Sequence, residues 1–326
     1  MDLFLPILLL IVGFVLLVKG ADWFVDGAAG VAKKCKIPAL VIGLTIVAFG
    51  TSAPELCVSV TSAIGQSTDI AIGNVLGSNI VNILLILGLS ALLHDLPVQK
   101  SSLRLDLPVL ALASVLILGL GVWGNALEWW DGLILIVVFA GYMFLLFRDA
   151  KKHPPVQSQE EEAPNGKFAA WFYRMKAHTW FLIVLLLVGL AMVVGGGTLL
   201  VESAKSIAKY FGVSERIIGL TVVAIGTSLP ELVTSVVAAK KGETDIAVGN
   251  IIGSNIFNIF LVAGVSSLFY PLAFTIEGNM IDAIVALGAA LLLFGLSLFK
   301  KHKLGKVAGA VMLLCFVGYY VYLFIG

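Results

Sequence analysis

Two pairs of segments in this chain repeat each other at a constant spacing of 176 residues. Gly43–Leu56 reads GLTIVAFGTSAPEL, and Gly219–Leu232 reads GLTVVAIGTSLPEL. Likewise Thr68–Ile83 reads TDIAIGNVLGSNIVNI, and Thr244–Ile259 reads TDIAVGNIIGSNIFNI. The pairs agree without a gap at 23 of 30 positions, 11 of 14 in the first pair and 12 of 16 in the second. Because the matches include Thr, Ser, Pro, Glu, Asp and Asn, a shared apolar bias cannot explain them. The fold must contain two related halves.

Around these segments the chain is apolar enough to cross a bilayer many times. Hydrophobic residues make up 60% of its 326 residues and charged residues 13%, whereas soluble proteins average about 25% charged residues. Apolar runs of the ~20 residues that a spanning helix needs recur along the whole chain. We therefore predict an all-α integral membrane protein with ten transmembrane helices. The expected spans are roughly 3–32, 38–65, 69–93, 105–123, 129–147, 178–208, 215–239, 245–270, 279–299 and 305–325.

The ten spans divide into two halves joined by one polar stretch. Residues 1–150 form the first five-span repeat, 151–177 a flexible cytoplasmic linker rich in Pro and Glu, and 178–326 the second repeat. Because five is odd, the second half must enter the membrane upside down relative to the first. Inverted repeats of this kind recur in secondary transporters, with binding sites at the repeat interface. We expect two inverted five-helix repeats that bring the repeated motifs face to face.

The distribution of basic residues predicts the orientation. With the N-terminus outside, 17 of the 21 Lys and Arg residues lie in cytoplasmic connections. Lys205, Lys209 and Arg216 lie outside, and Lys19 lies within the first span. Cytoplasmic connections normally carry the excess of basic residues. We expect a multi-pass protein of the inner or plasma membrane with both termini external. The run Leu3–Val18 lacks the basic segment of a signal peptide, so we interpret it as part of the first span.

Several classes of function find no support in the sequence. No basic cluster has interleaved aromatic residues, so we expect no nucleic-acid partner. Cys35, Cys57 and Cys315 lie far apart and show no disulfide or metal-ligand spacing. The four histidines lie at span ends or in loops, and no nucleophile–base pair lies within a span, so we expect no enzyme and no cofactor. We expect the chain to act as a monomer in the lipid bilayer.

Glu55 and Glu231 are the central observation, because each lies well inside an apolar span. A charged side chain at that depth costs at least ~2.5–3.5 kcal/mol, so intramembrane acidic residues usually mark functional sites. A single such residue could be a protonated Glu that serves helix packing. Two at repeat-related positions in nearly identical polar surroundings favour a functional site.

The residues around each glutamate suit a hard cation. Thr51, Ser52 and Glu55 stand at i, i+1 and i+4, which places Thr51 and Glu55 on one helix face, and the second copy repeats the pattern. All are oxygen donors, as Ca²⁺ and Na⁺ prefer. Pro54 and Pro230 lack an amide donor, which should free the carbonyl groups of the residues four positions earlier.

The third and eighth spans are expected to form the opposite wall of the site. Asn74, Ser78 and Asn82 recur at i, i+4 and i+8, and the second copy again repeats them. Each copy also carries a GxxxG pair, which permits close helix approach. By contrast, Asp22, Asp26 and Glu202 lie toward span ends. We interpret them as interface anchors and local ion pairs, with an ion-entry funnel as the alternative.

The motifs GTSAPE at 50–55 and GNVLGSN at 73–79, with their second copies, resemble the α-repeats of the sodium/calcium exchanger family in the cation/calcium antiporter superfamily. The resemblance implies two short central helix bundles, with the first and sixth spans lying obliquely outside them and gating the site. It also implies a set of cation ligands, with Asn258 where some members carry Asp. These ligands are the side chains of Thr51, Ser52, Glu55, Ser78, Asn82, Thr227, Ser228, Glu231, Ser254 and Asn258 and the carbonyl groups of Ala48 and Ala224.

Two carboxylates give the site a charge of about −2, which either one Ca²⁺ or several Na⁺ can neutralise. Both together would leave excess positive charge in a low-dielectric site, so the ions should exclude each other. We therefore predict an antiporter that exchanges Ca²⁺ for Na⁺ by alternating access. A Ca²⁺/H⁺ antiporter that uses the same carboxylates as proton carriers is the alternative, although that related family usually shows an Asn-Ala-x-Glu motif.

Overall fold

The computed structural model describes residues 3–152, 174–212, 224–299 and 302–325. Eight helices within these ranges are long and apolar enough to cross a membrane, and one bent pair makes a ninth if it counts as a single span. The expected span 215–239 begins on residues outside the described ranges. The structure therefore confirms the all-α membrane class, and the count of ten remains a prediction.

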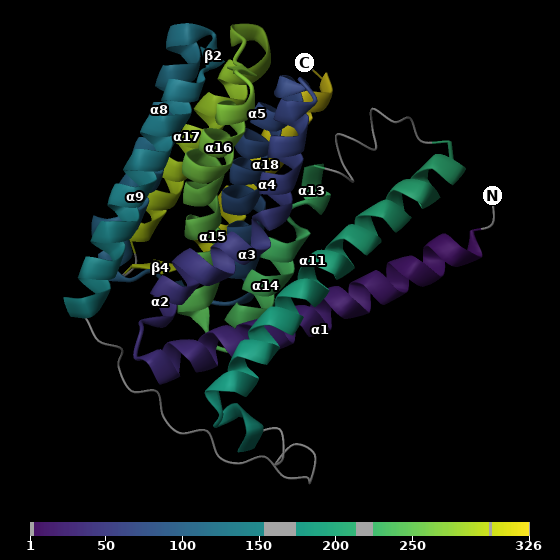
Figure 1. Cartoon of the computed structure of the whole chain (residues 1–326), viewed down its shortest axis with the longest axis vertical. Helices are drawn as coiled ribbons and strands as arrows, with labels where there is room; N and C mark the ends of the chain where they lie inside the picture. The colour runs from purple at the N-terminus through teal and green to yellow at the C-terminus, as the bar shows by residue number, and fades with distance from the viewer. Residues whose placement is uncertain (1–2, 153–173, 213–223, 300–301, 326) are drawn as a thin grey trace.

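The expected spans appear as single helices or as runs of short helical segments. In chain order the elements are α1 (Phe4–Cys35), α2 (Ala39–Ile42), η1 (Gly43–Val47), α3 (Ala48–Thr51), α4 (Ala53–Ile64), α5 (Thr68–Ile80), η2 (Val81–Leu87), α6 (Gly88–Leu93), β1 (Leu96–Pro97), α7 (Lys100–Arg104), α8 (Asp106–Gly124), β2 (Ala126–Leu127), α9 (Trp129–Lys152), α11 (Thr179–Tyr210), α13 (Ala224–Gly226), α14 (Leu229–Lys240), α15 (Thr244–Phe257), η4 (Asn258–Ala263), α16 (Gly264–Phe269), β3 (Leu272–Ala273), α17 (Ile276–Leu298), β4 (Lys303–Leu304) and α18 (Lys306–Ile325). Figure 1 shows them as one upright bundle with two long helices lying across it.

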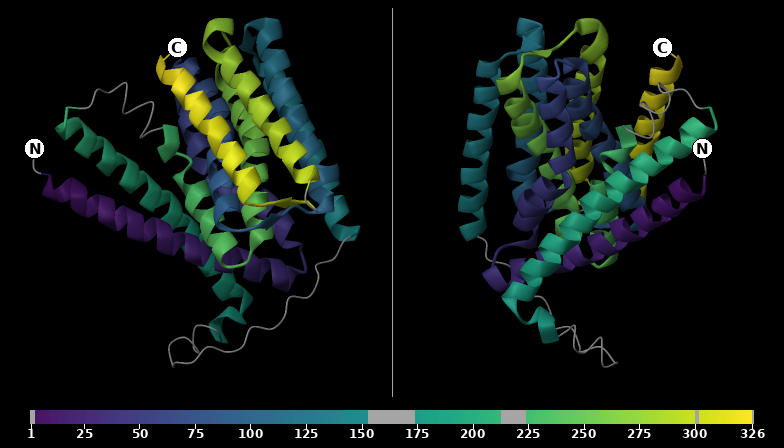
Figure 2. Two further views of the ribbon diagram at one scale, coloured as in Figure 1. Left: turned by 180° about the vertical axis from the view of Figure 1, so that it is seen from behind. Right: turned by 45° about the vertical axis from the view of Figure 1, so that its right-hand side comes forward.

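The two long helices, α1 and α11, run side by side and obliquely to the bundle (Figures 1 and 2). Glycines allow their backbones to touch. A Cβ atom on Gly13 would lie 2.9 Å from the carbonyl oxygen of Gly196, and one on Gly20 would lie 2.9 Å from that of Gly189. Small residues at helix crossings permit this approach in membranes, where packing replaces the hydrophobic effect. The first and sixth spans therefore have the oblique placement that the resemblance implies.

The centre of the bundle is formed by the spans that carry the repeated Asn/Ser motif. In the apolar window of Thr244–Phe269, 94% of the residues are buried, and 78% in that of Thr68–Leu93, against 22% in that of Phe4–Cys35. The glycines of α15 pack closely on the broken span, because a Cβ atom on Gly253 would lie 2.7 Å from the carbonyl oxygen of Leu44. The repeat counterparts of Leu40 and Leu44, at positions 216 and 220, lie outside the described ranges.

Two short antiparallel strand pairs, which the sequence did not predict, connect loops at the two ends of the bundle. β1 pairs with β4, and β2 pairs with β3. In Figure 1 the labels β2 and β4 stand at opposite ends of the bundle. The first residues of β1 and β3, Leu96 and Leu272, are 176 residues apart, so these strands are repeat-related and nonetheless lie at opposite ends.

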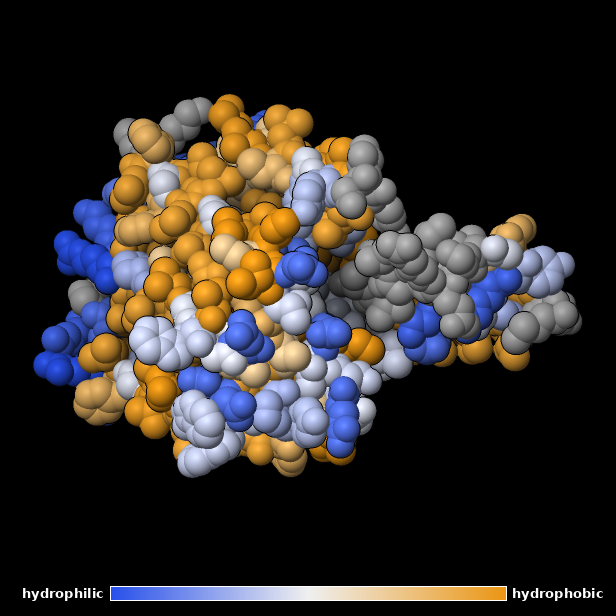
Figure 3. Space-filling view, turned by 90° about the horizontal axis from the view of Figure 1, so that it is seen from above, coloured by the Kyte–Doolittle hydropathy of each residue, from blue (hydrophilic) through white to orange (hydrophobic). Residues whose placement is uncertain are grey.

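The outside of the bundle is apolar, as a lipid-facing surface should be. Large hydrophobic side chains point outward on several helices; Val137 is 69% exposed and Leu314 72%. Seen from above, hydrophobic residues cover much of the bundle (Figure 3). Exposure of this extent is expected where lipid tails replace water as the solvent, and it supports the interpretation of the helices as membrane spans.

Candidate cation site

The helix carrying Glu55 breaks one turn before this residue. α3 ends at Thr51 and α4 begins at Ala53, with Ser52 (φ −85°, ψ 6°) between them and a bend of 47°. The expectation of one continuous helix face for Thr51 and Glu55 is therefore wrong. Pro54 lies in the first turn of α4, where its missing N–H group costs nothing. Because proline fits the first turn of a helix but not its interior, Pro54 favours the start of α4 over a continuation of α3.

The second copy has the same construction. Ser228 (φ −88°, ψ 5°) separates α13 from α14, and Pro230 lies in the first turn of α14. Each glutamate thereby lies in the first turn of a helix that begins inside the membrane region. The exposed N–H groups and the dipole of a helix N-terminus favour negative charge at this position. The break thus lowers the cost of an intramembrane carboxylate.

Both glutamate side chains are completely buried, at 0% exposure, and lie close enough to interact electrostatically. The Ser52 hydroxyl donates a hydrogen bond of 3.0 Å to Glu231 Oε1, which links the two copies directly. The hydroxyl groups of Thr227 and Ser78 lie beside Glu55, and those of Thr51 and Ser254 lie beside Glu231. The structure therefore brings the two distant motifs together, as the repeat predicts.

Many oxygen atoms in this cluster have no hydrogen-bond partner. The unpartnered buried atoms include Glu55 Oε1 and Oε2, Glu231 Oε2, Asn82 Oδ1 and Nδ2, Asn258 Oδ1, Thr227 Oγ1, Ser228 Oγ and Ser254 Oγ. A buried polar atom left unpaired costs about 1–3 kcal/mol, so such a concentration needs a compensating ligand. A hard cation bound by oxygen atoms would supply one.

Only two of the side chains in this cluster are acidic, and the other oxygen atoms belong to neutral groups. No group of three or more His, Cys, Asp or Glu side chains that could hold a metal ion occurs in the described part of the chain. The cluster instead offers two carboxylates surrounded by hydroxyl and amide oxygen atoms. Neutral oxygen ligands suit Ca²⁺ and Na⁺ and do not select softer metals.

The two carbonyl groups in the predicted ligand set lie at the starts of short helical turns. Ala48 begins α3, and Ala224 begins α13. The carbonyl oxygen of Ala48 accepts hydrogen bonds from Ser52 N at 2.9 Å and from Thr51 Oγ1 at 3.3 Å. In this structure its lone pairs are used within its own turn.

Asn74 and Asn250, which we expected in the wall of the site, fix the glutamate-bearing helices in place. Asn74 Nδ2 donates to Ser59 Oγ at 2.9 Å and to the carbonyl oxygen of Glu55 at 3.2 Å. Asn250 Nδ2 makes the equivalent bonds to Ser235 Oγ at 2.9 Å and to the Glu231 carbonyl oxygen at 3.5 Å. Ser59 and Ser235 were not predicted, although their spacing of 176 residues was a visible signal.

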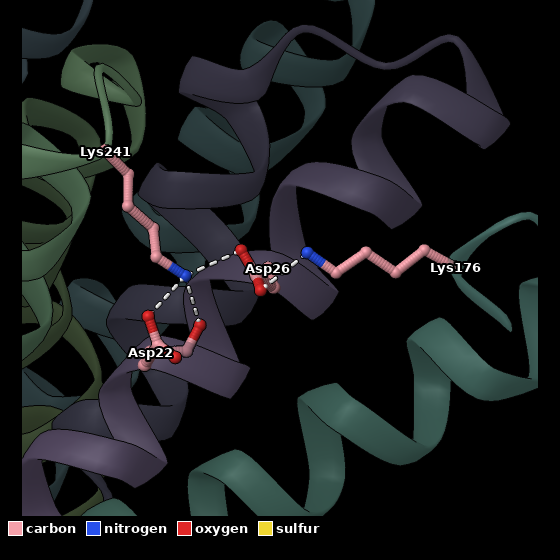
Figure 4. A network of polar contacts seen from close by, with 4 residues as sticks. All are labelled: Asp22, Asp26, Lys176 and Lys241. Carbon is pink, nitrogen blue, oxygen red and sulfur yellow. Dashed lines mark hydrogen bonds and ion pairs between the residues drawn. The ribbon is translucent and has the colours of Figure 1, made fainter. Parts of the chain in front are cut away.

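Asp22, Asp26 and Glu202 all form ion pairs, but only that of Glu202 is local as we expected, because the partners of Asp22 and Asp26 are distant in the sequence. Asp22 and Asp26 pair with Lys241, and Asp26 also pairs with Lys176 (Figure 4). Glu202 pairs with Lys205 three residues further along its own helix.

The family model for "Sodium/calcium exchanger protein" matches residues 5–148 and 181–325, which together include both copies of the motif. The chain belongs to this family. The sodium/calcium exchanger MaX1 of Methanosarcina acetivorans is 33% identical, over 97% of this chain and 98% of its own length. The inner membrane protein YrbG of Escherichia coli (strain K12) is 41% identical, over 81% of this chain and 79% of its own.

The fold is also that of a solved exchanger. A structure of the sodium-calcium exchanger NCX_Mj soaked with Na⁺ and Sr²⁺ superimposes with a TM-score of 0.83 at 31% identity, covering 98% of this chain and 99% of the other. This member of the sodium/calcium exchanger family is therefore a multi-pass membrane transporter and not an enzyme.

Proposed function

We propose that this exchanger-family member transports Ca²⁺ in one direction and Na⁺ in the other by alternating access at the buried site of Glu55 and Glu231. The observation that carries the proposal is the cluster of unpartnered oxygen atoms around two fully buried carboxylates. The similarity to the sodium/calcium exchangers MaX1 and NCX_Mj supports the choice of ions.

The proposed ligands come from both copies of the motif. They are the side chains of Thr51, Ser52, Glu55, Ser78, Asn82, Thr227, Ser228, Glu231, Ser254 and Asn258, with the carbonyl groups of Ala48 and Ala224. One Ca²⁺, or several Na⁺, would neutralise the charge of about −2, and the two kinds of ion would compete because their combined charge would be uncompensated. Competition for one neutralised site is the physical requirement for antiport.

The proposed architecture is two inverted five-span repeats, 1–150 and 178–326, joined by a cytoplasmic linker at 151–177, most of which lies outside the described residues. The placement of the repeat-related strands β1 and β3 at opposite ends of the bundle supports the inversion. With the basic residues inside, the chain would lie in the inner or plasma membrane with both termini external.

Purified protein in liposomes tests the proposal. Vesicles loaded with Na⁺ and diluted into choline buffer should accumulate ⁴⁵Ca²⁺, and removal of the Na⁺ gradient should stop the uptake. Liposomes without protein serve as the control. Uptake driven equally well by a pH gradient without Na⁺ would show that the carboxylates carry protons and that the protein is a Ca²⁺/H⁺ antiporter. Absence of ⁴⁵Ca²⁺ flux under either gradient would contradict Ca²⁺ transport.

A further inference from the structure

Three asparagines form a chain of hydrogen bonds across the interface between the two copies. Asn79 Nδ2 donates to the backbone carbonyl oxygen of Asn255 at 3.3 Å, and Asn258 Nδ2 donates to Asn79 Oδ1 at 3.2 Å. All three residues are at most 2% exposed. Asn258 begins the π-helical segment η4 beside the site, and its Oδ1 atom has no partner.

The backbone carbonyl group of Asn255, at one end of this hydrogen-bond chain, fixes the orientation of the side-chain amides of Asn79 and Asn258. A backbone carbonyl oxygen can only accept a hydrogen bond, so the Asn79 atom that faces it must be Nδ2. The atom of Asn79 that faces Asn258 is then Oδ1, which can only accept. Asn258 must therefore turn its Nδ2 toward Asn79, and its Oδ1 points away from this contact.

The repeat-related pair of asparagines, Asn255 and Asn82, has no such arrangement. Asn255, the repeat counterpart of Asn79, donates to the carbonyl oxygen of Ile251 in its own helix at 2.7 Å. Asn82, the counterpart of Asn258, has both amide atoms without a partner. The two asparagines that flank the site are thus held differently, although the local sequences GSNIVN and GSNIFN are almost the same.

We propose that Asn79 is a positioning residue that holds the Asn258 amide so that its oxygen atom, rather than its N–H groups, is available to the transported cation. Without this contact the Asn258 amide could rotate by 180° and present hydrogen-bond donors to a positive ion. The proposal rests on the proposed function, because it assigns Asn258 Oδ1 as a cation ligand. Asn79 itself would not touch the ion.

A double-mutant cycle tests this proposal. Asn79→Ala should raise the half-saturating Ca²⁺ concentration about five- to tenfold, the effect of one lost hydrogen bond, with the maximal rate little changed. Asn258→Ala should raise it at least as much. In the Asn258→Ala background, Asn79→Ala should have no further effect on Ca²⁺ affinity, because no amide remains to be oriented.

Asn279→Ala is the matched control, because Asn279 is a buried asparagine of α17 whose Oδ1 accepts from Thr275 N at 3.0 Å. This substitution removes a buried amide that does not belong to the hydrogen-bond chain of Asn79, Asn255 and Asn258. The Ca²⁺ affinity of the variant should therefore match that of the parent. If Asn79→Ala does not fold, Asn79→Ser removes the same acceptor and leaves a smaller cavity.

The possible outcomes separate this inference from the proposed function. Unchanged affinity in Asn79→Ala, or equal effects of Asn79→Ala in the parent and in Asn258→Ala, would overturn the positioning role. Unchanged affinity in Asn258→Ala would overturn it too, because the amide would not be a ligand. Ca²⁺ transport that depends on Glu55 and Glu231 would survive any of these results.

A separate cluster of charges joins α1 to the bundle at the end where α14 finishes. Lys241 Nζ, in the turn after α14, lies 2.7 Å from Asp22 Oδ1 and 2.7 Å from Asp26 Oδ1 of α1, and Lys176 Nζ lies 2.7 Å from Asp26 Oδ2 (Figure 4). Lys241 Nζ also donates to the backbone carbonyl oxygen of Asp22 at 2.8 Å. Two lysines and two aspartates thus take part in one network of ion pairs.

The repeat-related positions at the other end cannot form the same network. The counterparts of Asp22, Asp26 and Lys241 are Thr198, Glu202 and Gly65. Glu202 pairs instead with Lys205 of its own helix and is 62% exposed. Among the described residues, the network of Asp22, Asp26 and Lys241 therefore has no repeat-related equivalent.

The geometry points to this network as a latch that stabilises the docked position of α1 against the end of α14. α1 lies at the periphery of the molecule, with 22% of the residues in its apolar window buried. α14 carries Glu231 in its first turn. The latch therefore connects a peripheral helix to a helix of the site. Separation of α1 from this end would require both Lys241 pairs to break. Because the repeat-related residues cannot form this network, the latch should restrain α1 more at the α14 end of the bundle than at the other end.

Hydrogen exchange measured by mass spectrometry tests the latch independently of transport. Lys241→Gln should increase exchange about threefold or more in residues 22–35 of α1, because ion pairs of this kind restrain local opening. The neighbouring residue Lys240, which forms no ion pair within the described part of the chain, provides the matched control Lys240→Gln. Lys241→Arg should restore protection. Equal exchange in Lys241→Gln and the parent, or the same increase in Lys240→Gln, would overturn the latch.

Discussion

Two completely buried carboxylates, those of Glu55 and Glu231, lie at the centre of the site, and buried asparagine amides in the two motif copies meet different acceptors. Glu55 and Glu231 could be predicted because an acidic residue in an apolar run is rare and costly. The hydrogen-bond chain through Asn79 could not be predicted, because Asn79 and Asn255 have nearly identical sequence neighbours and yet donate to different carbonyl groups. Packing across the interface decides which acceptor each amide meets, and no local pattern encodes that choice.

Glu55→Gln and Glu231→Gln should each reduce Ca²⁺ transport to the level of empty liposomes. Each substitution keeps the side-chain shape but removes half of the negative charge that compensates Ca²⁺. Without ions, each variant should also unfold at a temperature a few degrees higher than the parent, because two buried carboxylates no longer repel each other. Glu277→Gln, at an exposed position, is the control for both measurements. Ca²⁺ flux retained in either site variant would contradict the proposed site.

Exchange should require Na⁺ and not K⁺. The family resemblance implies that some members carry an acidic residue at the position of Asn258, where a third carboxylate would let the site hold K⁺ together with Ca²⁺. Asn82 and Asn258 offer neutral oxygen atoms only, which keeps the site charge at about −2. ⁴⁵Ca²⁺ uptake into Na⁺-loaded vesicles, with and without external K⁺, measures this directly. A strict requirement for K⁺ would show that the charge argument is incomplete.

At the scale of elements, the apolar runs predict where helices lie but not where they break. The expected span 38–65 consists of α2, η1, α3 and α4, and three π-helical segments interrupt the described helices around the site. Wide turns of this kind often occur at functional sites. They arise where tertiary contacts outweigh helix propensity, so an apolar run does not show the residue at which a helix breaks.

The crossing of α1 and α11 should be sensitive to the size of single residues. Gly20→Ala should destabilise the protein by about 1–3 kcal/mol, because the added Cβ atom would lie 2.8 Å from Val193 N and 2.6 Å from Met192 Cβ. Gly195→Ala, on α11, meets no atom within 4 Å and should be neutral or stabilising by up to about 1 kcal/mol. Thermal unfolding in detergent compares the two. Equal stability of both variants would show that the helix pair is not packed as described.

At the scale of the whole molecule, the internal repeat predicted more than any single motif. It indicated two halves whose motifs meet, and the contact between Ser52 and Glu231 shows that meeting. It did not indicate the strand pairs, because two-residue strands have no recognisable pattern. Yet these pairs carry the best structural evidence for inversion, since β1 and β3 are repeat-related and lie at opposite ends of the bundle.

Cysteine labelling from the two sides of the membrane tests the inversion directly. In a background with the exposed Cys35, Cys57 and Cys315 replaced by serine, Gly65→Cys should react with an impermeant maleimide from outside the cell. Lys240→Cys, which lies next to the repeat counterpart of Gly65, should react only from inside, because inversion carries equivalent turns to opposite faces. Cysteines at Gly326 and Gln159, which lie outside the described residues, should label from outside and inside respectively. If Gly65→Cys and Lys240→Cys reacted from the same side, the two halves would have the same orientation, and a single site built face to face from both glutamates would lose its geometric basis.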